Sequence, residues 1–339
     1  MSYETLPLPT VAMSPHETTR FKVRPDQLVS RVTPAGDIYV LAHFGIAQIE
    51  VASWRLEVGG LVTRPLALTL DDLKAFPKVE IESFLKCAGF PHDATINTRA
   101  VSNAMWGGAR LADVLEAAGA DASARYLWAL APDHGTYARW SAQRYVKDLP
   151  FDRARERDVL LAYEVNGAPL SAAHGFPLRL LVPGYYGTNS VKWLCRLEVA
   201  MERPEHIYTT QLYNDPVAGN SSEGGTESKT APVWAAAPEA LIVAPADRAG
   251  IAAGRFEVWG WCWGADEIVA VEVSCDSGAT WQAAQVTPRS GWEWQRFSIA
   301  CDLAPGTHTI TARARDAAGR VQPPREARNA MHSVIVTAG

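Results

Sequence analysis

Hydrophobic and polar positions in the first part of the chain follow two different periods. The run Trp54–Val62 alternates and then reaches two glycines, which predicts a strand and a hairpin turn. Leu68–Pro77 and Arg110–Ala120 have helical spacing; Pro77 ends the first helix, and Gly119 takes a C-cap position in the second. Three further stretches are strand-like: Val79–Phe90, Phe176–Gly184 and Val191–Met201. Because helices and strands do not alternate in a βαβ order, the pattern indicates an α+β domain.

The last third of the chain has a different pattern. Short strand-like runs recur every 10–15 residues, with Gly, Pro and Asp between them, and no amphipathic segment of helical length interrupts them. This pattern predicts an all-β, immunoglobulin-like sandwich. A polar segment rich in Gly and Ser, Asn214–Pro232, precedes it and is typical of a linker. We therefore divide the chain into an irregular N-terminal arm (1–35), an α+β domain (36–205), a linker (206–232) and a β-sandwich (233–339).

Charge and hydropathy exclude two classes of protein. The net charge of −5 argues against nucleic-acid binding, which normally requires a basic face. No apolar run approaches the roughly 18 residues that a transmembrane helix needs. The first 20 residues lack the apolar core of a signal peptide and have no twin-arginine pair. We expect a soluble protein, cytoplasmic as the sequence stands, or periplasmic if a signal segment has been removed.

The cysteines and tryptophans limit the chemistry further. The chain has five cysteines, an odd number that argues against a full disulfide framework. There is no CxxC pair of a structural zinc site and no CxxCH of a covalently attached haem. Five of the 12 tryptophans crowd into one short region, which we interpret as core and interface packing: Trp259, Trp261, Trp263, Trp292 and Trp294. The cluster also suggests a large apolar surface, as dimer interfaces often have.

Longer stretches of the sequence resemble one family. Two of them resemble the molybdopterin domain of the sulfite oxidase family, and two resemble the C-terminal dimerisation domain of that family: Ser102–Ala120, Asp158–Leu194, Val271–Val286 and Ala312–Pro323. They occur in the order that the family has. The resemblance implies a molybdopterin-binding α+β domain, a β-sandwich dimerisation domain, one molybdenum cofactor per chain and a homodimer.

The cysteine in the sequence Lys-Cys-Ala-Gly-Phe is Cys87, at the end of a predicted strand. An isolated cysteine is usually a buried structural thiol. The resemblance instead implies that Cys87 is catalytic and supplies a thiolate to the metal. Soft sulfur donors suit such a metal, by extension from the preferences of other transition metals. Gly89 would let the backbone approach the pterin closely.

The resemblance also implies a set of further contacts to the pterin and its phosphate. The positions that match the contacts in the family are His43, Asp133, His174, Arg179, Ser190, Val191 and Lys192. Arg179 suits a phosphate as a fork of donors and Lys192 as a point charge. Asp133 can accept hydrogen bonds from the N–H groups of the pterin. Tyr163 matches a tyrosine that lines the substrate pocket of the family.

The sequence departs from the family where sulfite would bind. Sulfite oxidases gather arginines there, because a guanidinium fork matches an oxyanion. Leu41, His92 and Asn189 stand in place of three such arginines, and the segment after Cys87 is shorter. His92 and Arg99 are the basic residues nearest to this part of the sequence. These changes make sulfite a doubtful substrate.

We therefore expect a molybdenum-dependent oxidoreductase that transfers an oxygen atom to or from a small sulfur or nitrogen compound. The chain has no His-Pro-Gly-Gly segment of a cytochrome b5 type domain, so electrons would pass to a separate acceptor such as a cytochrome. Three alternatives stay open: a true sulfite dehydrogenase with a rearranged anion pocket, an S- or N-oxide reductase, and a non-catalytic protein that binds the cofactor. The sequence does not distinguish the substrate, the direction of the reaction or the acceptor.

Overall fold

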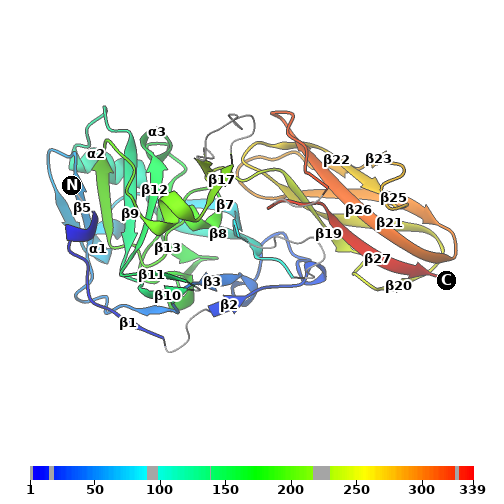
Figure 1. The fold of residues 1–339 in the computed structure, drawn as a ribbon, viewed down its shortest axis with the longest axis horizontal. Coiled ribbons are helices and arrows are strands. Elements are labelled where there is room, and N and C mark those ends of the chain that lie inside the picture. Colours follow the sequence, from blue (N-terminus) through cyan, green and yellow to red (C-terminus); the bar gives the residue numbers. More distant parts are fainter. Residues whose placement is uncertain (1–2, 15–18, 90–97, 138, 217–229, 325–327) are drawn as a thin grey trace, which may run out of the picture.

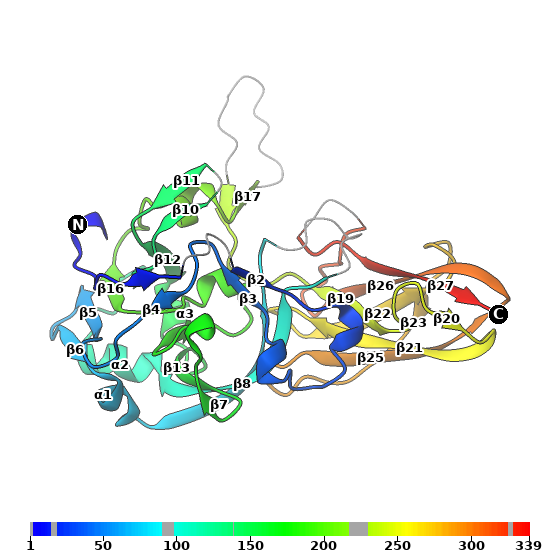
Figure 2. The same cartoon turned by 90° about the horizontal axis from the view of Figure 1, so that it is seen from below.

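The computed structural model describes residues 3–14, 19–89, 98–137, 139–216, 230–324 and 328–339. Two lobes lie side by side, with the N-terminus at the far end of one and the C-terminus at the far end of the other (Figure 1). In the same view turned by 90°, the lobes again meet along a single junction (Figure 2). None of the helices in the described ranges has the length and apolarity needed to cross a membrane.

The first lobe is an α+β domain with two sheets of five strands. One has the order β12-β9-β16-β5-β6, in which β16 and β5 are parallel and the other neighbours antiparallel. Its strands are β5 (Leu56–Gly60), β6 (Leu66–Leu68), β9 (Tyr126–Ala131), β12 (Tyr145–Pro150) and β16 (Arg196–Ala200). The other has the order β14-β13-β8-β7, with β15 also paired to β13. Its strands are β7 (Lys78–Lys86), β8 (Val101–Arg110), β13 (Leu160–Val165), β14 (Ala168–Pro169) and β15 (Arg179–Leu181).

Three short α-helices accompany these sheets: α1 (Leu70–Lys74), α2 (Leu111–Ala118) and α3 (Phe151–Ala154). The first two confirm the predicted helices. The side chain of Thr69 accepts a hydrogen bond from the N–H of Asp72, which caps the start of α1. Gly119 ends α2 with a left-handed φ of 64°. The apolar face of α2 packs into the main core of the domain, so burial rather than helix propensity stabilises it.

Two of the predicted strands are shorter than the pattern suggested. Only Arg179–Leu181 and Arg196–Ala200 are strands, whereas residues 187–194 form a 3-10 turn and bends. The reason is that these residues turn around a cavity and most of them line its wall, as described below. Residues 207–216, which we expected to be part of a linker, form a π-helical turn (Ile207–Gln211) and the strand β17 (Asn214–Pro216), paired with β18 (Thr230–Pro232).

The remaining short elements of the first lobe include parts of the N-terminal arm. Two arm strands pair with strands that follow the arm: β1 (Ala12–Met13) with β4 (Ala47–Gln48), and β2 (Thr19–Phe21) with β3 (Val40–Ala42). A further hairpin consists of β10 (Gly135–Tyr137) and β11 (Trp140–Ala142). Single-turn 3-10 helices are Tyr3–Thr5, Pro25–Gln27, Ala35–Asp37, Ala172–His174 and Gly187–Asn189. The arm is thus anchored to the domain rather than irregular throughout.

The second lobe is a sandwich of two sheets, as predicted. One sheet has the order β19-β21-β25-β24, formed by β19 (Glu239–Ala244), β21 (Gly254–Trp263), β25 (Gln295–Leu303) and β24 (Gln285–Val286). The facing sheet has the order β20-β27-β26-β22-β23, formed by β20 (Gly250–Ile251), β27 (His332–Ala338), β26 (Gly306–Asp316), β22 (Ile268–Ser274) and β23 (Gln282–Ala283). Alternate residues of both sheets form one apolar core between them, which includes Cys262 and Cys301.

Three tryptophans of the second lobe, Trp261, Trp263 and Trp294, pack against the first lobe. Trp261 stacks on Trp294, with ring centroids 4.7 Å apart and planes within 5°. Both belong to a buried cluster that includes Phe84 and Leu28 of the first lobe. The indole N–H of Trp261 donates to the carbonyl of Leu28 at 2.7 Å. Our expectation that this cluster exposes an apolar surface for a dimer is therefore wrong, because the surface is covered within the same chain.

Candidate cofactor site

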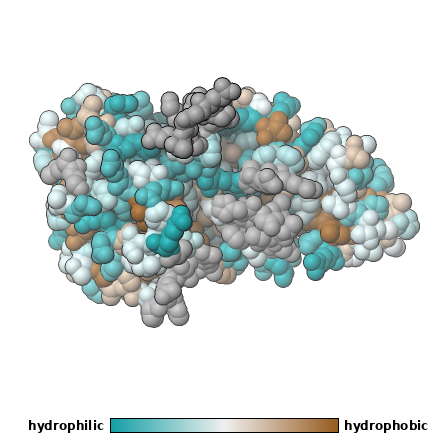
Figure 3. Space-filling model, in the orientation of Figure 1, coloured by the Kyte–Doolittle hydropathy of each residue, from teal (hydrophilic) through white to brown (hydrophobic). Residues whose placement is uncertain are grey.

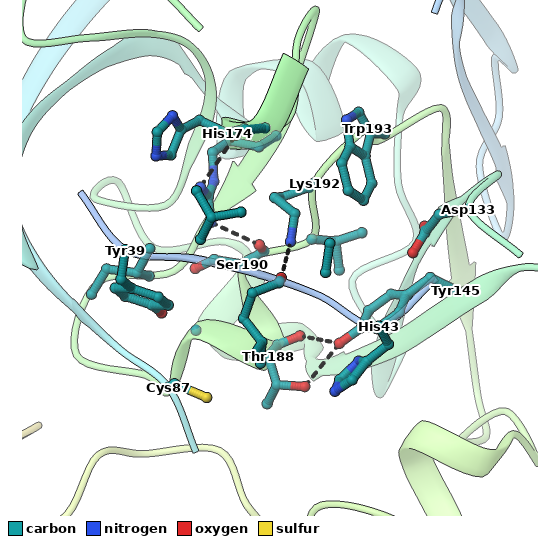
Figure 4. Close-up of a pocket in the computed structure, with 18 of the residues that line it drawn as sticks. Tyr39, His43, Cys87, Asp133, Tyr145, His174, Thr188, Ser190, Lys192 and Trp193 are labelled. Carbon is teal, nitrogen blue, oxygen red and sulfur yellow. Dashed lines mark hydrogen bonds between the residues drawn. The ribbon is translucent and has the colours of Figure 1, made fainter. Parts of the chain in front are cut away.

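A cavity of about 70 Å³ lies in the first lobe, near the end of β7. Its walls come from β3, from the residue after β7, from β15, and from the turn that precedes β16 (Figure 4). Figure 4 shows Cys87 on one side of the cavity and His174 and Trp193 on the other. Side chains far apart in the sequence thus converge on one small volume, which is typical of a ligand site.

Cys87 directly follows β7 and is 4% exposed. Its N–H donates to the carbonyl of Ala100 at 2.9 Å, which fixes the turn. Burial raises the pKa of the thiol, while the N–H of Gly89 and the charges of Lys86, Lys192 and Arg328 oppose that rise. The sulfur therefore stands in a positive environment that would favour a thiolate once a cation replaced its proton.

Two cationic side chains are buried beside the cavity. Nη1 and Nη2 of Arg179 donate to the carbonyls of His174 and Ser190 at 3.2 and 3.1 Å. Nζ of Lys192 donates to the carbonyl of Leu41 at 2.7 Å. Burial lowers the pKa of Arg179 to about 10 and, together with repulsion from Arg179, lowers that of Lys192 to about 8. No ion pair within the described residues involves either cation, so the pair can accept an anion.

Burial shifts the pKa of two further polar residues of the cavity, Asp133 and His174, toward the neutral form. Burial raises the pKa of Asp133 to about 6, against the attraction of Lys192. His174 has a pKa lowered to about 4, because it is buried and lies near Arg179. Its Nδ1 lies 2.8 Å from the hydroxyl of Ser171, so the imidazole is held in place and neutral at pH 7.

Two polar atoms of the cavity wall, Oδ1 of Asp133 and Nε of Arg179, are buried without a hydrogen-bond partner. Such atoms normally have a partner, since burying one alone costs about 1–3 kcal/mol. One is an acceptor and the other a donor, so they suit a ligand that carries both. A pterin with N–H groups and a phosphate fits this donor set, and the sulfur of Cys87 fits a soft metal.

The structure brings together most of the residues singled out from the sequence. All seven expected contacts to the pterin, the thiol of Cys87 and Leu41 line the cavity: His43, Asp133, His174, Arg179, Ser190, Val191 and Lys192. His92 lies outside the described residues. Arg99 is buried, donates to the carbonyl of Thr98 at 3.0 Å, and is not part of the wall.

Two expectations do not match the geometry. Tyr163 does not line the cavity; it belongs to the main apolar core, whereas Cys87 belongs to a different cluster with Ala162. A register shift in the pairing of β13 occurs at Tyr163, and the side chain faces the opposite side of the sheet from Ala162. Asn189 also turns away from the cavity wall, because its amide donates to the carbonyls of Tyr186 and Val233 at 3.0 and 3.3 Å.

Three tyrosines of the cavity wall were not predicted from the sequence: Tyr39, Tyr145 and Tyr213. The hydroxyl of Tyr145 donates to the carbonyl of Thr188 at 2.8 Å. The hydroxyl of Tyr213 lies 3.3 Å from Nε2 of His43. Tyr213 falls in the range 206–232 that we interpreted as a linker, so nothing in its local pattern marked it.

The raised pKa of Asp133 predicts how stability depends on pH. Since the folded protein binds this proton more tightly than the unfolded chain, the stabilisation is complete below the ordinary value of 3.8 and is lost as pH rises through about 6. We expect cofactor-free wild type to lose up to about 3 kcal/mol relative to Asp133→Asn between pH 4 and 7. Urea unfolding of both proteins at these two pH values measures the difference. Parallel pH curves would contradict the burial of an ionisable Asp133.

Both lobes of the chain are similar to known proteins. The family model described as oxidoreductase molybdopterin binding domain matches residues 43–208, and the Mo-co oxidoreductase dimerisation domain matches residues 232–337. Human mitochondrial sulfite oxidase is 32% identical over 321 residues, which cover 86% of this chain and 57% of that protein. Sulfite oxidase of Arabidopsis thaliana is 30% identical, with 87% of this chain and 83% of that protein covered.

Nitrate reductase [NAD(P)H] of Hordeum vulgare is also 30% identical, over 87% of this chain and 37% of that protein. The crystal structure of the sulfane dehydrogenase SoxCD from Paracoccus pantotrophus has the same fold, with a TM-score of 0.81, 23% identity, and 99% and 94% of the two chains covered. The chain spans 57% of the length of the human and macaque enzymes that it matches. Family models along both lobes and relatives above 30% identity lead to one conclusion: the chain belongs to the sulfite oxidase family of molybdenum-cofactor oxidoreductases.

Proposed function

We propose that this chain is a redox enzyme in which Cys87 ligates molybdenum. The observation that carries the proposal is the placement of a buried thiol, two buried cations and two unpartnered polar atoms around one cavity. When bound, the molybdenum cofactor supplies the two-electron chemistry and the oxygen-atom transfer. The protein contributes the position of the thiol and the polar side chains that line the cavity.

The other cavity residues have distinct roles in this proposal. Arg179 and Lys192 bind the phosphate of the pterin, and Asp133 accepts from its N–H groups. His43, His174, Ser190 and Val191 complete the cofactor contacts. Tyr213 lies beside His43, and its hydroxyl can donate to a substrate. It takes the role that the sequence suggested for Tyr163.

The substrate in this proposal is a neutral or larger sulfur or nitrogen compound. Among the described residues of the cavity wall, Arg179 is the one arginine, and two of its nitrogens already donate to carbonyls. Leu41 takes the place of a family arginine in the wall, and Asn189 has turned its amide to the backbone. With Arg179 and Lys192 assigned to the phosphate of the pterin, the described wall offers little to a small dianion.

Cys87→Ser tests the metal ligand. Serine offers a hard oxygen that stays protonated near neutral pH, so we expect loss of the thiolate-to-metal absorption band and of activity. The matched control is Cys195→Ser, because Cys195 is equally buried but donates to the carbonyl of Leu130 in the core. Visible spectra and elemental analysis of both proteins, expressed in a host that makes the cofactor, measure the effect. A wild-type protein without molybdenum would refute the proposal.

Sulfite kinetics test the substrate. Each missing charge-assisted contact costs about 1.5–3 kcal/mol, so two or three together would weaken sulfite capture by orders of magnitude. We expect kcat/KM for sulfite, with an artificial one-electron acceptor, to be far below that for a panel of neutral sulfur and nitrogen compounds. If His92 replaces a lost arginine, sulfite oxidation should improve as pH falls toward about 6.5. A micromolar KM with fast turnover at pH 8 would contradict the proposed pocket.

A separate electron acceptor, such as a cytochrome, and a second copy of the chain are the proposed partners. The matched dimerisation domain supports a homodimer. Three large apolar side chains of the sandwich are about half exposed: Val269 (50%), Val321 (50%) and Ile335 (48%). Val269 and Ile335 belong to the sheet of β22, β26 and β27. Val321 forms a β-bridge with Arg315 of the same sheet. The face of the molecule seen in Figure 3 is a mosaic of polar and apolar residues. We propose the outer face of that sheet as the dimer surface.

Light scattering tests this surface. We expect a dimer at micromolar concentration for the wild type and a monomer for Ile335→Asp, because a buried unpaired carboxylate opposes association. Val51→Asp, at an exposed valine of the first lobe, is the control and should stay dimeric. A wild-type monomer would argue against the dimer, and a dimeric Ile335→Asp would place the interface elsewhere.

A further inference from the structure

The strand that ends at Cys87 is bonded to both lobes. Along one edge, β7 pairs with β8 from Lys78 to Lys86. The strand also contacts Trp292 of the sandwich. The N–H of Phe84 donates to the carbonyl of Trp292 at 2.9 Å, and Ser83 forms a β-bridge with Trp292. The junction between the lobes therefore begins three residues before the proposed metal ligand.

Lys86, the last residue of this strand, carries a buried cross-lobe ion pair. Nζ of Lys86 lies 3.2 Å from Oε2 of Glu239 on β19, and the two side chains are 0% and 5% exposed. The same ammonium donates to the carbonyl of Cys87 at 3.3 Å. Glu239 of the sandwich thus pairs with the ammonium of Lys86, and this ammonium donates a hydrogen bond to the backbone of Cys87.

A second cation reaches the same turn from the sandwich itself. Nη1 of Arg328, located between β26 and β27, donates to the carbonyl of Ala88 at 2.7 Å. Its Nε and Nη2 bond to the carboxylate of Asp215 on β17 at 2.9 and 2.5 Å. A forked pair of this kind fixes the guanidinium in one orientation. The carbonyls of Cys87 and Ala88 are therefore each held by a cation, and each cation has its carboxylate on the opposite side of the junction.

We propose that Glu239 and Arg328 are positioning residues for the thiolate of Cys87, so that the sandwich is part of the metal site as well as a candidate dimerisation unit. This proposal rests on the proposed function of Cys87. The two cations fix the direction of consecutive peptide groups, and through them the direction of the cysteine side chain. Partners of this second layer commonly change metal affinity by about 10- to 100-fold.

Variants of Arg328 test the proposal. We expect Arg328→Met to retain about 10- to 100-fold less molybdenum during dialysis and to shift the thiolate-to-metal band. Arg328→Lys should rescue part of the effect, because an ammonium can still donate to the carbonyl of Ala88. In cofactor-free protein, iodoacetamide should alkylate Cys87 faster in Arg328→Met than in wild type, measured by peptide mapping. Glu239→Gln should act in the same direction, and if it fails to fold, Arg328→Met alone decides.

The matched control is Arg31→Met. Arg31 forks onto Glu82 of the same strand at 2.9 Å, and its Nη2 lies 4.0 Å from Glu293 of the sandwich. Removing it breaks a pair on β7 without touching the Cys87 turn, so it should behave as wild type. If wild type holds molybdenum and Arg328→Met matches it in retention, band and alkylation rate, the positioning role is overturned. If wild type holds none, the proposed function fails, and alkylation still tests the turn.

Discussion

The cofactor site holds three buried ionisable side chains: Asp133, Arg179 and Lys192. Burial strongly disfavours their charged forms unless hydrogen bonds or opposite charges compensate for the lost water. Arg179 and Lys192 are partly compensated because they donate hydrogen bonds to backbone carbonyls. The attraction of Lys192 offsets only part of the effect of burial on Asp133. The rest of the site follows from this constraint. The lowered pKa values of the cations and the raised pKa of the carboxyl mean that each group is held at a cost, as expected where a fold keeps a place for a polar ligand.

The cavity depends in turn on how the two lobes meet. The tryptophans of the sandwich bury themselves against Phe84 and Leu28, and this apolar contact brings Glu239 and Arg328 to the turn of Cys87. An apolar interface of this kind has little freedom to slide, because its stacked rings interdigitate. Charged groups at its edge are therefore presented to the turn with fixed geometry. Packing of the second lobe and chemistry in the first lobe are parts of one arrangement.

Local patterns in the sequence anticipated the elements whose causes are local. The helix α2 and its glycine cap, the strands of the sandwich and the turn after β7 follow from spacing and turn residues within a few positions. Resemblance to the family supplied the set of residues around the cavity. It could not tell that Tyr163 lies at a register shift, since that shift depends on how β13 pairs with β8.

The remaining differences come from contacts between distant parts of the chain. The hydroxyl of Tyr213, in the range that we interpreted as a linker, lies beside His43, which is 170 positions earlier in the sequence. Asn189 bonds to carbonyls near the start of the sandwich, so its side chain is not available to the cavity. The tryptophans looked like a surface for a second copy because the sequence does not show which partner covers an apolar face. Each of these outcomes is decided by tertiary packing rather than by local preference.

X-ray absorption at the molybdenum edge tests the central claim most directly, because it counts the sulfur atoms bound to the metal. The measurement compares wild type with Cys87→Ser, both loaded in a host that makes the cofactor. If Cys87 is the protein ligand, the wild type has one more sulfur neighbour at the metal than the variant. Equal sulfur coordination in the two proteins would contradict the account, whatever their activities.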